Sequence, residues 1–265
     1  MTLNVFSAGV AGRIAKSVAR EYEEMTNNKV NLVIGGSVAG INRFLSGENF
    51  DVMILADESN VRMLMGPEYV DKYDIFAGNE MAIIGNNVTE DNWKQVLLDE
   101  NVTIKHMNPF DDPGGYRAIM ALKLADFYEP SLSKRFFAKS NYKGSEREAY
   151  DNTKDPVKKP AFINLTDNEV FIAYRSLAVE NGLHYTRLPA IMNLGKSVNE
   201  PFYNKVSFTV ESGEEVFGTT ILHAVVIPKT AKNKKEAEVF YGLFLEIDFT
   251  SYGFTDEQRH VVLNP

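Results

Sequence analysis

The chain has 265 residues, with 28 Lys and Arg side chains against 36 Asp and Glu, so its net charge is −8, and it contains no cysteine. The absence of cysteine excludes disulfides, thiolate zinc sites and a cysteine nucleophile. The acidic balance argues against nucleic acid or an anionic membrane as the main partner, because binding to either depends on summed Lys and Arg charge. An anionic ligand therefore needs a local site.

No apolar run approaches the roughly 20 residues that are needed to span a bilayer. The chain opens with a strand-like segment, residues 1–6, that lacks the basic and apolar regions of a signal peptide. Two locations fit these features. The protein is either cytoplasmic or a mature chain whose export segment has been removed.

Strands alternate with helices in the first third of the chain. Strand patterns occur at residues 3–8, 30–34 and 51–57, and the last is a continuous apolar run typical of a strand buried on both faces. Helical spacing follows each strand, carried by Ile14, Val18, Tyr22 and Met25, by Val38, Ile41 and Leu45, and by Val61, Leu64 and Met65. This alternation predicts an α/β fold with a mostly parallel sheet.

A second series of elements begins at residue 81. The patterns predict strands at residues 81–84, 102–106, 170–174 and 223–228, and helices at residues 93–98, 116–127 and 237–245. Residues 140–160 are rich in Lys, Glu, Asp and Asn, which predicts an exposed excursion. The sequence therefore predicts two successive sheets, each with its own helices.

Three strand-to-helix junctions are built from small residues, at residues 7–12, 35–40 and 112–116. A helix N-terminus offers unpaired N–H donors and about half a positive charge, and such loops lie at the carboxyl ends of strands, where α/β sheets bind ligands. Each loop alone is better explained as a tight turn or an N-cap. The three loops together favour an anion site.

Other candidate groups are less specific. There is no nucleotide-binding fingerprint and no nucleophile elbow. Asp111 and Asp112 suit acid–base or metal chemistry, but an Asp directly before Pro113 also suits a helix N-cap. Arg117 and Arg175 suit either an oxyanion or a structural ion pair. The histidines show no metal-ligand spacing, which favours structural roles for His106, His184, His223 and His260.

Four segments, residues 76–81, 108–117, 174–185 and 227–229, closely resemble the tungstate/molybdate-binding proteins of ABC importers. The resemblance covers nearly the whole chain in order, and residues 108–117 are its most specific motif. It implies a two-lobe type II periplasmic-binding-protein fold, in which each lobe is a mostly parallel sheet flanked by helices and an oxyanion is held between the lobes. The first lobe would comprise residues 1–80 and 207–265, and the second residues 81–206.

The same resemblance implies the ligand contacts. They are Ala8, Gly9 and Val10 in the first loop, Ser37 in the second, Asp112, Gly114, Gly115 and Tyr116 in the third, and Tyr174 at a strand end. Two positions depart from the family pattern. Val10 replaces a serine, and Ala173 replaces a glutamate that is thought to join an aspartate in binding the metal of the oxyanion. Asp112 would then be the one remaining carboxylate that could contact the metal.

These departures predict a changed affinity or a changed anion, because one lost charge-assisted hydrogen bond is worth about 1.5–3 kcal/mol. The leading expectation is a monomeric, non-enzymatic solute-binding protein outside the cytoplasm, without a cofactor or a nucleic-acid partner. It would capture molybdate, tungstate or a related oxyanion by hinge closure and deliver it to an ABC permease. The alternative is a diverged sensor or binding protein for another anion, which Val10 and Ala173 favour. An enzyme that uses Asp111 or Asp112 with Arg117 lacks an activated nucleophile and a cofactor motif.

Overall fold

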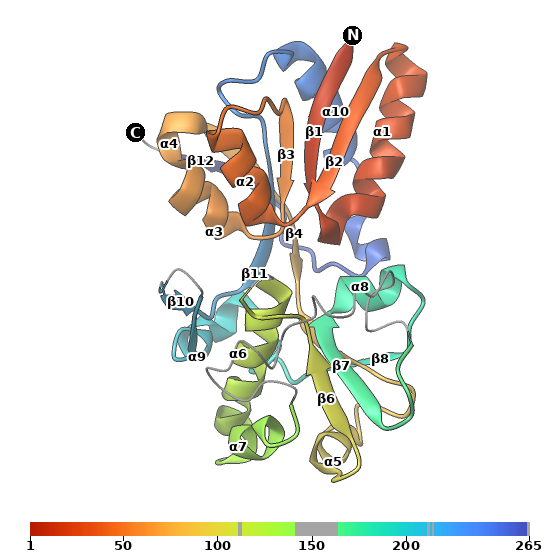
Figure 1. Ribbon diagram of the computed structural model, residues 1–265, viewed down its shortest axis with the longest axis vertical. Coiled ribbons are helices and arrows are strands. Elements are labelled where there is room, and N and C mark those ends of the chain that lie inside the picture. Colours follow the sequence, from red (N-terminus) through yellow and green to blue (C-terminus); the bar gives the residue numbers. More distant parts are fainter. Residues whose placement is uncertain (111–112, 141–163, 211–212, 214, 264–265) are drawn as a thin grey trace. The chain divides into compact units, whose positions relative to one another are not determined.

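The computed structural model describes residues 1–110, 113–140, 164–210, 213 and 215–263, and the chain divides into two compact units. The first unit comprises Met1–Gly78, Leu222–Ser251 and Thr255–Pro265, and the second comprises Asn79–Ile221 and Tyr252–Phe254. Both units combine β-sheet with helices, so the predicted α/β class is confirmed (Figure 1). The division into lobes at residues 80 and 207 stays a prediction beside these observed units.

The first unit is built on a six-stranded sheet with the order β12-β4-β11-β3-β1-β2. Its strands are β1 (Thr2–Ala8), β2 (Lys29–Gly35), β3 (Val52–Leu55), β4 (Lys72–Asn79), β11 (Ile221–Val226) and β12 (Arg259–Val262). Strand β1 pairs in parallel with β2 and with β3, whereas β11 runs antiparallel to β3 and β12 antiparallel to β4. The sheet is therefore mixed, because the late strands β11 and β12 join a parallel core from the other end of the chain.

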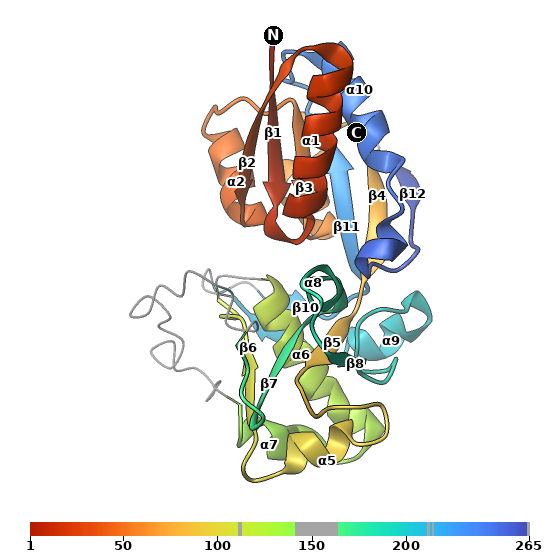
Figure 2. The ribbon, with the colours of Figure 1, turned by 90° about the vertical axis from the view of Figure 1, so that its right-hand side faces the viewer.

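Helices cover both faces of this sheet. Helices α1 (Gly12–Thr26) and α10 (Lys234–Leu245) pack against each other on one face, and α2 (Ser37–Leu45) lies on the other (Figure 2). Short helical segments α3 (Glu58–Asn60), Val61–Met65 and α4 (Gly66–Tyr69) lead from β3 to β4. The helices predicted in the first third of the chain are thus present.

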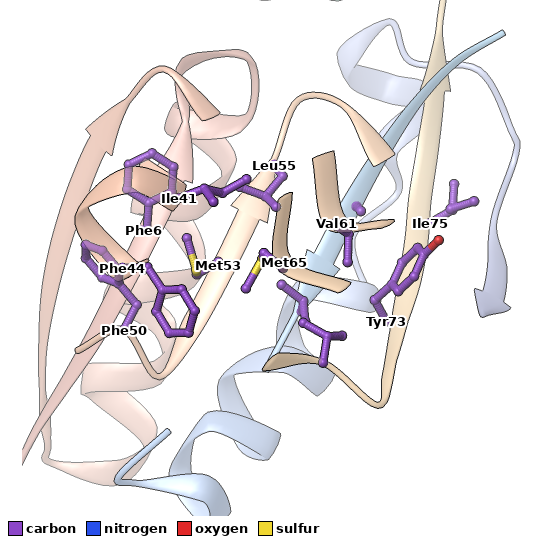
Figure 3. Packing of buried hydrophobic residues seen from close by; sticks show 13 residues of the cluster. Phe6, Ile41, Phe44, Phe50, Met53, Leu55, Val61, Met65, Tyr73 and Ile75 are labelled. Carbon is purple, nitrogen blue, oxygen red and sulfur yellow. The ribbon is translucent and has the colours of Figure 1, made fainter. Parts of the chain in front are cut away.

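The core on the α2 face is a cluster of aromatic and aliphatic side chains from strands and helices (Figure 3). Ile41 and Phe44 of α2 are buried in it, whereas Val38 and Leu45, which were expected on the same apolar face, are 46% and 41% exposed. The reason lies at Gly40, where an added Cβ would stand 2.2 Å from the ring of Phe6. Helix α2 therefore lies against the sheet along its glycine side, which rotates Val38 and Leu45 toward solvent.

The second unit contains a four-stranded sheet with the order β6-β7-β5-β8 and a two-stranded hairpin. The bounds are β5 (Met81–Ile84), β6 (Thr103–His106), β7 (Glu169–Tyr174), β8 (Tyr185–Arg187), β9 (Ser207–Thr209) and β10 (Glu215–Phe217). Strands β6 and β7 are parallel, and β5 runs antiparallel to β7 and to β8. Ile84, Phe171 and Ala173 form its buried apolar cluster with Ala178.

The helices of the second unit are α5 (Trp93–Leu98), α6 (Pro113–Tyr128), α7 (Leu132–Phe137), α8 (Arg175–Glu180) and α9 (Glu200–Tyr203). Ser140, expected to open an exposed excursion, is instead 1% exposed, and residues 141–160 of that prediction lie outside the described residues. Across the described part of the chain, every helix is too short or too polar to cross a bilayer.

Candidate functional site

The carboxyl ends of three parallel strands meet at one edge of the first unit's sheet. In the register of these strands, Ala8 lies opposite Gly35, and Ser7 lies opposite Ile34 on one side and Ile54 on the other. The loops that follow therefore lie together. We call this edge, comprising residues 8–10, 36–37 and 56, the β1–β3 edge. It brings together four of the predicted contacts, Ala8, Gly9, Val10 and Ser37.

Two helical segments begin at the β1–β3 edge without a side-chain cap. Ala8 and Gly36 occupy the N-cap positions, and neither makes a side-chain hydrogen bond to the first turn. By contrast, Asp57 caps the helix that follows β3 by accepting from the backbone N–H of Ser59 at 3.0 Å. The first N–H groups of a helix have no intrahelical acceptor. The uncapped starts therefore leave donors for an external anion, and Gly9, with no atom within 4 Å of an added Cβ, leaves open space beside them.

Ser37 joins two of the loops. Its side chain is 2% exposed, and its Oγ accepts a hydrogen bond from the backbone N–H of Ala56 at 2.8 Å. The carbonyl of Ala56 lies 2.7 Å from Nδ1 of the buried His223, so both backbone groups of Ala56 are held. A serine hydroxyl that accepts one bond still carries a proton to donate. Ser37 thus combines a fixed position with donor chemistry, whereas Val10, 9% exposed, offers no side-chain donor.

A similar edge forms in the second unit, where β6 and β7 run in parallel with His106 opposite Ile172. We call residues 107–110, 113–116 and 174–176 the β6–β7 edge. Gly114 and Gly115 lie in the first turn of α6 and are buried. An added Cβ on Gly115 would stand 2.5 Å from the carbonyl oxygen of Asn108 and 2.6 Å from that of Met107. Helix α6 can therefore begin this close to the preceding loop only with glycine at position 115.

Aromatic rings and a buried cation line the β6–β7 edge. Arg117, 3% exposed, donates from Nη1 to the hydroxyl of Tyr174 at 2.9 Å, and its guanidinium lies 5.9 Å from the ring of Tyr116 and 6.0 Å from that of Tyr174. The ring of Tyr116 stacks on Phe208 at 6.5 Å. The hydroxyl of Tyr174 therefore accepts a charge-assisted hydrogen bond at this edge.

His106 fixes the loop that precedes α6. Its Nδ1 lies 2.9 Å from the carbonyl of Met107, so this nitrogen carries the proton, and Nε2 accepts from the hydroxyl of Ser140 at 2.9 Å. Burial lowers the pKa of His106 from 6.5 to about 4, although the Met107 carbonyl favours the protonated form. His106 is therefore a neutral structural histidine.

This burial predicts an acid-sensitive fold. Because the unfolded chain binds more protons than the folded one between pH 6.5 and about 4, the contribution of His106 is complete above pH 6.5 and is lost as the pH falls toward 4. We expect a loss of roughly 2–4 kcal/mol over this window, measured by urea unfolding at each pH, and a flatter profile for His106→Gln. An imidazole of His106 that titrates near its ordinary pKa in an NMR titration would contradict this.

The other side chains that the sequence suggested for a site are the aspartates, Arg175 and metal-binding groups. Asp111 and Asp112 lie outside the described residues. Arg175 is used structurally, since its guanidinium binds Glu80 and the carbonyls of Gly253 and Phe254. Among the described side chains, no three of His, Asp and Glu gather as a metal site.

Sequence reasoning missed Glu80, which is fully buried beside two arginines and an asparagine. The one available signal was a charged residue directly before the apolar run of residues 81–84.

Three comparisons bear on this arrangement. A family model described as "bacterial extracellular solute-binding protein" matches residues 3–246. An uncharacterized solute-binding protein of Methanococcus aeolicus is 30% identical over 93% of this chain and 79% of its own. The molybdate/tungstate-binding protein WtpA of Pyrococcus abyssi is 27% identical over 92% of this chain and 80% of its own. The periplasmic molybdate-binding protein of Azotobacter vinelandii shares the fold with a TM-score of 0.62 at 14% identity, over 97% of this chain and all (100%) of the other.

Proposed function

Because the chain belongs to the family of bacterial extracellular solute-binding proteins, we propose that it captures a tetrahedral oxyanion of the molybdate and tungstate class outside the cytoplasm. The relative from Pyrococcus abyssi supports this choice of anion. Delivery by a monomer to an ABC-type permease is part of the same proposal. Solute binding, rather than catalysis, is the activity that the family description names.

The observation that carries the proposal is the pair of uncapped helical starts at the β1–β3 edge. Their N-cap residues, Ala8 and Gly36, have no side-chain acceptor, and Ser37, the first residue of α2, adds a fixed hydroxyl. Backbone N–H groups and the helix dipole stabilise an anion without a counter-charge. Such a local site is what an oxyanion needs on a chain whose net charge is −8.

The β6–β7 edge would supply the second set of contacts. Gly114, Gly115 and Tyr116 lie at the start of α6, and Tyr174 presents a hydroxyl that is held by the buried Arg117. We propose that one anion takes contacts from both edges, which would stabilise a closed state over an open one. Contact of Asp112 with the metal of the anion remains a prediction.

A different oxyanion is the second candidate. Val10 and Ala173, the two departures from the family pattern, are 9% and 2% exposed and carry no polar side-chain atom. Neither side chain can donate to the ligand or bind its metal. A site without these groups would favour an anion that stays four-coordinate, such as sulfate or phosphate.

Titrating ligand-free protein with molybdate, tungstate, sulfate and phosphate tests the proposal, by calorimetry and by thermal unfolding. An anion present at 100 times its dissociation constant should stabilise the folded state by about 2.7 kcal/mol. A response to molybdate and tungstate alone would support the first candidate, and a response to sulfate or phosphate alone would support the second. If none of the four anions binds, the oxyanion proposal is wrong.

Each edge is tested by one variant. Ser37→Ala and Tyr174→Phe should each weaken binding of the preferred anion by about fivefold to a hundredfold, because each removes one hydrogen bond that a charged ligand strengthens. Ser133→Ala, in the first turn of α7, and Tyr185→Phe, on β8, are the matched controls and should bind like the unaltered chain. If only one of the two edge variants loses affinity, the anion does not contact both edges.

A further inference from the structure

Glu80 is a fully buried carboxylate that accepts three hydrogen bonds within the second unit and makes one further ion-pair contact. Oε1 accepts from Arg175 Nη1 at 2.8 Å and lies 2.8 Å from Arg187 Nε in the ion pair. Oε2 accepts from Arg187 Nη2 at 2.9 Å and from Asn193 Nδ2 at 2.8 Å. We call these four residues the Glu80 cluster.

Such a cluster is not explained by stability alone. Moving charges from water into the protein interior costs free energy, and ion pairing often does no more than offset that cost. Well-packed apolar residues would therefore stabilise the fold about as well. What an ion cluster adds is fixed geometry. Here that geometry joins segments far apart in the sequence, since Arg175, Arg187 and Asn193 are 95, 107 and 113 residues from Glu80.

The cluster and its direct neighbours in the sequence contact segments where the chain passes between units. Glu80 itself follows the first passage, at Gly78 and Asn79. Leu194 follows the cluster residue Asn193 in the sequence, and its carbonyl accepts from the N–H of Ile221. Ile221 is the last residue before the second passage. Arg175 donates from Nε to the carbonyl of Gly253 at 2.9 Å. Gly253 belongs to Tyr252–Phe254, a short second-unit segment that lies in the sequence between two first-unit segments.

The same residues fix the strand end that carries Tyr174. The N–H of Arg175 donates to the carbonyl of Glu80 at 2.8 Å, and Asn79 Nδ2 donates to the hydroxyl of Ser176 at 2.7 Å. Tyr174 itself pairs with Met81 across β7 and β5. Residues 79–81 therefore hold residues 174–176 from both the backbone and the side chains.

We propose that Glu80 is a positioning residue that couples the Tyr174–Ser176 strand end to segments where the chain passes between the units. It does not contact the ligand. It holds the tyrosine that does, and it ties that tyrosine to the segments whose backbone must rotate if the units close. The coupling to a ligand rests on the proposed function, whereas the positioning of residues 174–176 does not.

Hydrogen exchange on ligand-free protein tests the positioning by itself. In Glu80→Gln, the amides of Arg175, Ser176 and Ile221 should exchange about tenfold faster or more, while those of β6 keep their rates. Glu169→Gln is the matched control, because it breaks the ion pair with Lys105 at the other end of β7 and should leave these amides unchanged. Should Glu80→Gln fail to fold, Arg187→Gln removes one partner on the exposed side of the cluster and is read in the same way. Unchanged rates, or an equal rise throughout the second unit, would overturn the proposal.

A double-mutant cycle tests the coupling to the ligand. Glu80→Gln should weaken binding of the preferred anion by about tenfold. The loss of binding free energy in the double variant Glu80→Gln, Tyr174→Phe should be smaller than the sum of the losses in the two single variants. Glu80→Asp, which keeps the charge, should restore part of the affinity. Additive losses, or unchanged affinity in folded Glu80→Gln, would overturn the coupling. If the unaltered chain binds none of the four anions, the proposed function fails, and the exchange measurement still decides the positioning.

Discussion

Replacing Gly115 by alanine is expected to destabilise the second unit and to abolish anion binding. The new methyl group would meet the backbone carbonyl oxygens of Asn108 and Met107 at 2.5 and 2.6 Å, and backbone cannot move aside as a flexible side chain can. Overpacking of this kind costs about 1–3 kcal/mol and occasionally more. Because the clash lies in the first turn of α6, relief of it must move the helix start that the proposal assigns to the anion. Urea unfolding and calorimetric titration of the variant measure the two effects.

Gly242→Ala is the control for this substitution. Gly242 lies within α10, and an added Cβ there meets no atom within 4 Å. Alanine is a better helix former than glycine, so this variant should gain up to about 1 kcal/mol. If Gly115→Ala proves as stable as Gly242→Ala, the close approach of α6 to residues 107–108 does not constrain the fold.

Local patterns predicted the elements that are apolar and buried along their whole length. Strands β3 and β5 are runs of four apolar residues with every position buried. Helix α5, which buries only Trp93 and Leu97, also spans residues 93–98 as expected, because its apolar residues follow helical spacing. Patterns failed where a long-range contact decides the outcome. Strand β12 carries Arg259 and His260 and exists because it pairs with β4, almost 190 residues earlier. The orientation of α2 depends on a missing side chain at Gly40, which apolar spacing cannot register.

The site could be predicted only in its backbone chemistry. Small residues after parallel strands indicated where helix starts would gather, and the register of β1, β2 and β3 places Ala8 and Ser37 at one edge. The sequence could not predict which side chains form hydrogen bonds or ion pairs with one another. Arg175 could be read as an anion ligand or as a structural ion pair, and the choice depends on Glu80 and Gly253, neither of which is near it in the sequence.

Asp51 shows the same dependence on distant partners and carries the second large expected effect. Its fully buried carboxylate accepts from the backbone N–H of Asn4 at 3.0 Å, of Lys232 at 2.9 Å and of Asn233 at 3.0 Å. It thereby joins β1 to the start of α10, whose N-cap residue is Asn233. Burial favours the neutral acid, but these hydrogen bonds outweigh it and lower the pKa of Asp51 below its ordinary value.

Asp51→Ala should therefore lower the free energy of unfolding by about 2–4 kcal/mol at neutral pH, since it leaves several backbone donors without an acceptor. The sign of the pH effect follows from the lowered pKa. The contribution is present above the ordinary pKa of 3.8 and is lost as the pH falls through the lower folded-state value, because the unfolded chain then binds the proton first. Urea unfolding from pH 7 down to about pH 3 should show the variant and the unaltered chain converging at the acid end. Asp248→Ala removes an exposed carboxylate that accepts from the N–H and the hydroxyl of its near neighbour Thr250, and this control should change stability far less. A constant gap between Asp51→Ala and the unaltered chain at every pH would show that the charge of Asp51 does not bind these donors, and that only the lost volume matters.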